Sequence, residues 1–201
     1  MPLQEVQKQV GALRQAWIVV EREFTRATRA DKAGDHVAAR AGFAEVLRLE
    51  PSPRNRYHEL ALERLAYAEA AIRDEIQSDL RGLEHLLEAP LEGLRQAELA
   101  EAGRLARAVR EHPGVTGSQT ARVEAAIKVF ATRLDAEERV KDALFANDLD
   151  ACGRLEGQLA FLDAWLPVGA PERKGLSDAQ ERLGKRLARL ASTRRLSEAS
   201  K

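Results

Sequence analysis

The chain has 201 residues, and its 32 Lys and Arg residues balance its 32 Asp and Glu residues, so its formal charge is zero. This balance excludes a uniformly basic nucleic-acid-binding protein and a protein with a long acidic tail, because either would leave a net charge. Apolar residues make up 44% of the chain, which is enough for a buried core. They are mostly Ala and Leu, which favour helices, whereas aromatic residues are only 4% and the residues that favour strands are scarce.

The single cysteine, Cys152, allows no intrachain disulfide, which excludes a small secreted domain held together by disulfides. The first ten residues alternate polar and apolar side chains where a signal peptide needs a continuous apolar stretch. The longest apolar run, residues 16–20, is far shorter than the roughly 18 residues of a membrane span. We therefore expect a cytoplasmic protein without a membrane span.

Glycine and proline are sparse, and between them the apolar residues recur every three or four residues, which is the period of an α-helix. The sequence therefore predicts an all-α fold, a bundle of about seven antiparallel helices without strands, two of them unusually long. The expected helices cover residues 3 to about 30, 35–49, 54–88, 91–110, 118–146, 149–166 and 177–194. Asp35 and Asp148 are expected to cap helix N-termini, and Ser177 with Gln180 has the spacing of a capping box.

The first expected helix carries a heptad seam, in which apolar residues alternate at spacings of three and four. Its positions are Leu3, Val6, Val10, Leu13, Trp17, Val20, Phe24 and Ala27. The residues beside the seam form no evident charge code for a second chain. The seam can therefore pack on the protein's own helices or, in coiled-coil fashion, on a partner.

Residues 34–51 carry a second pattern, in which a Gly-Asp turn precedes a small residue, an aromatic residue, an apolar pair, a leucine and a closing proline. These places are taken by Ala39, Phe43, Val46, Leu47, Leu49 and Pro51. The segment resembles the second helix of a tetratricopeptide repeat. The opening of a next repeat is matched by Tyr57, Leu60 and Ala61, whereas Glu23 and Arg26 stand where the family has large apolar residues. The resemblance implies a helical hairpin that binds peptides or proteins and catalyses no reaction.

Residues 112–117, which contain a Pro-Gly pair, form the longest break between expected helices in the middle of the chain. The sequence predicts an N-terminal bundle of long helices with the tetratricopeptide-like hairpin at 1–111. It predicts a C-terminal bundle that ends in a basic helix and tail at 118–201. One continuous domain is the alternative.

No catalytic or metal-binding pattern in the sequence is complete. The His-Glu pair at 58–59 begins a zinc-protease motif, but Leu62 stands where the second histidine must be. Residues 148–153 open like a calcium loop, but Cys152 replaces a ligand and Leu159 stands in place of the bidentate carboxylate. Cys152 lies on an apolar seam, where a cysteine usually acts as a small hydrophobic residue. We expect no catalytic residue, no metal and no cofactor, and predict that the chain is not an enzyme.

The zero net charge conceals an uneven distribution. Residues 172–201 contain nine Lys and Arg against four Asp and Glu, a formal charge of +5, so residues 1–171 carry −5. The basic residues of the last expected helix and the tail include Arg182, Lys185, Arg186, Arg189, Arg194 and Arg195. They can contact phosphate groups, an acidic partner or the chain's own acidic part. No aromatic residue follows Trp165, so contacts with nucleic acid would be to backbone phosphates rather than to stacked bases.

These patterns predict a non-enzymatic helical scaffold or adaptor protein. Its expected partner is a protein, and that protein can be a second copy of the chain in a homodimer. The seam positions expected to meet it are Leu3, Val6, Val10, Leu13, Trp17, Val20 and Phe24. The alternative is a nucleic-acid-associated protein that holds phosphates with its basic C-terminal residues.

Overall fold

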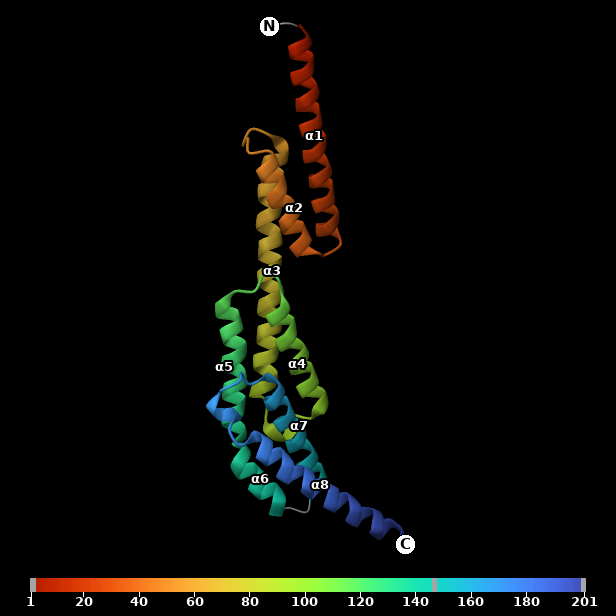
Figure 1. Ribbon diagram of the computed structural model, residues 1–201, viewed down its shortest axis with the longest axis vertical. Coiled ribbons are helices and arrows are strands. Elements are labelled where there is room, and N and C mark those ends of the chain that lie inside the picture. The colour runs from red at the N-terminus through yellow and green to blue at the C-terminus, as the bar shows by residue number, and fades with distance from the viewer. Residues whose placement is uncertain (1–2, 146–147, 200–201) are drawn as a thin grey trace. The chain divides into compact units, whose positions relative to one another are not determined.

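The computed structural model describes residues 3–145 and 148–199, with the side chains of Glu137 and of residues 194–199 left out. The described residues contain eight α-helices, two short 3₁₀ helices and no strand, which confirms the expected all-α class (Figure 1). The α-helices are α1 (Leu3–Lys32), α2 (His36–Leu49), α3 (Arg56–Glu88), α4 (Gln96–Glu111), α5 (Gly117–Leu134), α6 (Ala136–Phe145), α7 (Leu149–Trp165) and α8 (Leu176–Ala199). The 3₁₀ helices are η1 (Leu91–Gly93) and η2 (Pro171–Arg173).

The described part of the chain has one α-helix more than the sequence predicts, because the helix expected at 118–146 is divided. Asp135 separates α5 from α6 and has a φ of 41°. This left-handed conformation is uncommon for a residue other than glycine but is tolerated by aspartate. The expected helix at 91–110 also differs, since residues 91–93 form η1 and α4 begins only at Gln96.

Helix caps agree with the sequence at two of three places. Asp35 Oδ1 accepts a hydrogen bond from the Ala38 backbone N–H at 2.9 Å. Asp148 Oδ1 likewise accepts from Asp150 and Ala151, so both expected caps are confirmed. The capping box expected at Ser177 is wrong, because α8 already begins at Leu176. The chain forms a capping box at 116–119 instead, at the start of α5.

The chain divides into two compact units, residues 1–75 and residues 76–201. The boundary lies inside α3, which contributes its first part to unit 1 and its last part to unit 2. The domain boundary expected around residues 112–117 is therefore not where the structure divides the chain. That segment is the connection between α4 and α5 within unit 2.

Unit 1 is an α1–α2 hairpin packed on the first part of α3. Gly34, with a φ of 77°, allows the tight turn between the two helices of the hairpin. The core of the unit comes from all three helices and consists of Val20, Ala27, Ala39, Phe43, Val46, Ala61 and Ala68. Phe24 extends this core, with its ring centroid 5.7 Å from that of Phe43 and 5.1 Å from that of Tyr57.

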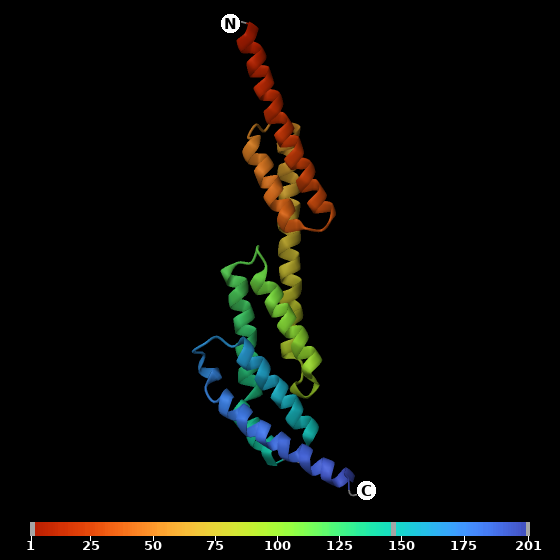
Figure 2. The ribbon, with the colours of Figure 1, turned by 45° about the vertical axis from the view of Figure 1, so that its right-hand side comes forward.

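Unit 2 buries apolar residues from the end of α3 and from the helices that follow. Its most deeply buried large side chains are Ile76, Leu80, Leu83, Leu94, Ile127, Phe130, Leu134, Leu159, Leu162, Leu176 and Leu183. Helices α7 and α8 lie side by side (Figure 2), and leucines of both helices, among them Leu159 and Leu183, are fully buried. The amide of the buried Gln158 donates to the Leu91 carbonyl at 2.8 Å and to the Leu94 carbonyl at 3.3 Å. It thereby ties η1 to α7.

We predict that Gly42→Ala destabilises unit 1 by about 1–3 kcal/mol, the usual cost of adding a methyl group to a filled contact. A Cβ atom at Gly42 would lie 2.7 Å from the Ala27 Cβ, so α1 and α2 would have to move apart. The matched control is Gly153→Ala in α7, where a Cβ atom meets nothing within 4 Å. That change should be neutral or stabilising, because alanine favours helices. Urea unfolding followed by circular dichroism tests both variants, and an unchanged curve for Gly42→Ala would contradict the close crossing.

Candidate functional site

The first half of α1 presents an apolar face to solvent. Five seam positions are exposed, and we call them the exposed face of α1: Leu3 (74%), Val6 (41%), Val10 (60%), Leu13 (71%) and Trp17 (45%). At Val20 the exposure falls to 3%, because α1 there enters the core of unit 1. Within this unit, the N-terminal part of α1 extends past the turn that joins α2 to α3 (Figure 1).

The remaining seam positions belong to the protein's own core. Val20 is buried, and Phe24 packs on Phe43 and Tyr57. Trp17 marks the transition, since its ring lies edge-on to Tyr57 with 5.3 Å between the centroids while nearly half of the residue remains exposed. The exposed part of the seam is thus shorter than the whole seam that the sequence predicts.

The length of α2 explains why the face is uncovered. Helix α1 has 30 residues and is about 45 Å long, whereas α2 has 14 residues and is about 21 Å long. Because α2 runs back along α1 from the turn at Gly34, it reaches only the second half of α1. The prolines at 51 and 53 then prevent α2 from continuing.

Two further exposed apolar residues of α1, Ile18 and Val19, are not predicted by the heptad pattern. They are 39% and 44% exposed, and they fall between seam positions. The one signal that could have identified them is the unbroken apolar run at residues 16–20. They lie on average roughly 130° around the helix axis from the middle of the seam, so they do not extend the exposed face of α1, and Val19 faces the groove between α1 and α2.

A groove of about 570 Å³ lies between α1 and α2. Small side chains line its floor, including Ala27, Ala38 and Gly42, because the two helices cross closely there. Three charged residues also line the groove, Glu23, Arg26 and Glu45. Glu23 pairs with Arg26 at 3.8 Å, and Glu45 pairs with Arg48 at 2.6 Å.

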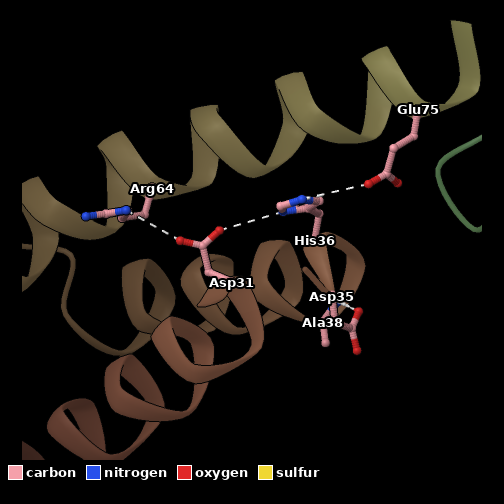
Figure 3. A network of polar contacts seen from close by, with 6 residues as sticks. All are labelled: Asp31, Asp35, His36, Ala38, Arg64 and Glu75. Carbon is pink, nitrogen blue, oxygen red and sulfur yellow. Dashed lines mark hydrogen bonds and ion pairs between the residues drawn. The ribbon is translucent and has the colours of Figure 1, made fainter. Parts of the chain in front are cut away.

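A polar network joins the three helices of unit 1 (Figure 3). Asp31 of α1 is 7% exposed and lies 3.4 Å from the Arg64 guanidinium of α3. Its other oxygen lies 3.7 Å from His36 Nδ1, and His36 Nε2 lies 3.7 Å from Glu75 Oε1. The distances to His36 are longer than hydrogen bonds. The network links α1, α2 and α3, and its members act as a structural tie between them.

The basic residues of α8 differ in their accessibility. Arg182, Lys185 and Arg189 are exposed, and Lys185 pairs with Glu181 at 2.5 Å. The hydrogen bond from Lys185 lowers the pKa of the Glu181 carboxyl. Arg186 is half-buried, and its charge acts on the Cys152 thiol of α7. The side chains of Arg194 and Arg195 lie outside the described residues.

Cys152 is fully buried, and its Sγ lies 3.4 Å from the Ala143 carbonyl oxygen, to which it donates. Burial raises the pKa of the thiol, and the charge of Arg186 offsets part of this increase. A nucleophilic cysteine needs a low pKa and access to its substrate. Cys152 has neither of these properties.

No family model matches this chain, and comparison with curated proteins and with solved structures finds no match either. Across residues 3–145 and 148–199, no helix has both the length and the apolar character needed to cross a bilayer. Among the same residues, no three His, Cys, Asp or Glu side chains are grouped so that they could hold a metal ion.

We predict that Cys152 reacts slowly with thiol reagents in the native protein at about pH 8, because burial removes access and disfavours the thiolate. One thiol per chain should become reactive only after denaturation. An aromatic disulfide reagent measures both rates, with a short cysteine-containing peptide as the control. Rapid reaction of one thiol per native chain would contradict the packing of α7.

Proposed function

We propose that this chain is a non-enzymatic helical interaction protein whose contact surface is the exposed face of α1. The observation that carries the proposal is the abrupt change in exposure along one heptad seam. Val20 and Ala27 are 3% and 1% exposed, whereas the five positions before them range from 41% to 74%. We further propose a scaffold or adaptor role in the cytoplasm.

The energetics favour a partner with an apolar helical face of its own. The five exposed fractions together amount to about three fully exposed side chains. Burial of an apolar side chain contributes about 1.5–3 kcal/mol, so covering this face stabilises a complex by about 4–9 kcal/mol. Association itself costs about 4–15 kcal/mol. A stable complex therefore needs comparable apolar surface from the partner, as in coiled-coil packing.

The hairpin beside this face supports the same class of function. Ala39, Phe43 and Val46, on which the tetratricopeptide resemblance rests, are all fully buried. The proposal includes kinship with that family at residues 34–51. In this interpretation the α1–α2 hairpin is a rigid base from which the first half of α1 projects.

We predict that Leu13→Glu removes binding of the protein partner without unfolding the chain. Leu13 is 71% exposed, so a charge there leaves the core intact but cannot be buried in an apolar contact without a large cost. The measurement is affinity capture from an extract of the native cells, with the full chain as bait and the captured proteins, endogenous copies of the chain included, identified by mass spectrometry.

The matched control is Gln15→Glu, which adds the same charge two residues away on the opposite face of α1. Proteins retained by the wild type and by Gln15→Glu, and lost with Leu13→Glu, support the proposal. Identical sets of captured proteins for the two variants would argue against this surface.

A second candidate function, binding of nucleic-acid phosphates, is favoured by the exposure of Arg182, Lys185 and Arg189 on α8. Residues 172–201 carry +5, which gives this segment a positive potential despite the zero total. The ion pair of Lys185 with Glu181 reduces the charge available to a ligand. This candidate therefore ranks second.

For this candidate we predict that replacing Arg182, Lys185 and Arg189 together with Gln weakens binding to duplex DNA or RNA. Loss of three phosphate contacts should reduce the slope of log K against log salt by about 2.7. Point variants are preferable to deletion of α8, because Leu176 and Leu183 of that helix are core residues. Fluorescence anisotropy at about 50 and about 200 mM salt gives the slope.

The control variant replaces three exposed arginines outside α8 with Gln, namely Arg40, Arg73 and Arg107. It removes the same amount of charge as the α8 variant. Absence of binding at the lower salt concentration would contradict a phosphate site on α8. If the control variant weakens nucleic-acid binding as much as the α8 variant does, that result would contradict it too.

A further inference from the structure

We propose that the exposed face of α1 pairs with the same face of a second copy of this chain, in antiparallel orientation over residues 3–19. The inference deepens the proposed function, on which it rests, by naming the partner. It is argued from the spacing of the seam, from the residues beside it and from the position of the hairpin that follows it.

A second copy of the chain offers an apolar helical surface that can cover the exposed face of α1. In the second half of α1 the seam is covered by helices of its own chain, whereas from Leu3 to Trp17 its positions are 41–74% exposed. A second α1 offers an uncovered seam with the same spacing and the same length, about 25 Å for 17 residues. The side chains of one seam then pack between those of the other as knobs into holes, and both copies bury the same apolar surface.

The residues beside the seam are compatible with their own copies. In the antiparallel register that places Val10 opposite Leu13, Gln7 lies beside Arg14 of the other copy and Gln9 lies beside Ala16, so no like charges face each other. A flank of like charges would instead repel its own copy. Residues 3–19 contain one acidic and two basic residues, although charged residues make up 32% of the whole chain. This segment therefore carries little charge that would oppose self-association.

The position of the hairpin sets the orientation. Trp17 already contacts Tyr57, and Val20 lies in the core of unit 1. In a parallel pair, the α1–α2 hairpins of both copies would crowd together just beyond Trp17. In an antiparallel pair they lie at opposite ends of the paired segment. Heptad geometry then places Val10 of one copy opposite Leu13 of the other, and Val6 opposite Trp17.

Sedimentation equilibrium of the full chain between about 1 and about 100 µM tests self-association, since weak coiled-coil pairs dissociate in the micromolar range. We expect the mass to rise with concentration from 22.2 kDa toward twice that value. Leu13→Glu should stay monomeric throughout this range, and Gln15→Glu should dimerise like the wild type. Circular dichroism checks that both variants keep their helix content, as expected because both positions are exposed.

A wild-type chain that remains monomeric at all concentrations would overturn the inference, as would dimerisation that Leu13→Glu leaves unchanged. The proposed function has a separate outcome. If the chain is monomeric but captures another protein through Leu13, the face is an interaction surface and its partner is not a second copy. If neither association depends on Leu13, both proposals fail.

Disulfide trapping tests the orientation. Val10→Cys and Leu13→Cys chains, distinguished by a tag, are oxidised separately and as a mixture. The antiparallel pair predicts a disulfide in the mixture and little within either variant alone, because Val10 meets Leu13. Efficient trapping of either variant alone would show a parallel pair and overturn the antiparallel arrangement. Cys152 does not interfere, since it is fully buried and its thiol has a raised pKa.

Discussion

The close crossing of α1 and α2 is the contact on which the arrangement of unit 1 depends. Gly42 brings the two backbones so near that a Cβ atom would meet Ala27 at 2.7 Å, and the aromatic contact of Phe24 with Phe43 lies beside this crossing. Tight packing there fixes α2 against the second half of α1. Since α2 has 14 residues and α1 has 30, α2 does not reach the seam positions from Leu3 to Trp17, which are 41–74% exposed. The exposed face of α1 is thus a consequence of unequal helix lengths.

The sequence predicts the helices well and their junctions less well. The all-α class and the caps at Asp35 and Asp148 follow from periodicity and capping residues. The break at Asp135 could not be predicted, because no glycine or proline marks it and the turn depends on one left-handed aspartate. The division inside α3 has no local signal either, since a helix continues through it and only its tertiary neighbours change.

The exposed face of α1 could likewise be predicted from the sequence only in part. Seam positions in the covered and uncovered halves of α1 belong to the same residue classes, so periodicity alone cannot tell a core position such as Val20 from an exposed one such as Val10. The prolines at 51 and 53 distinguish the two halves of the seam, because they end α2 and thereby determine how far it covers α1. The tie between Asp31, His36 and Arg64 is equally invisible in sequence, since it joins residues of three helices.

The two candidate surfaces differ in the force that would drive binding, and this difference separates them physically. The exposed face of α1 is apolar, and residues 3–19 carry a formal charge of only +1, so association there depends on hydrophobic burial and little on ionic strength. Phosphate contacts by Arg182, Lys185 and Arg189 would instead release counterions and weaken steeply with salt. The overall charge of zero indicates neither surface, because it is the sum of −5 over residues 1–171 and +5 over residues 172–201. A partner that remains bound as the salt concentration rises therefore belongs to α1 rather than to α8.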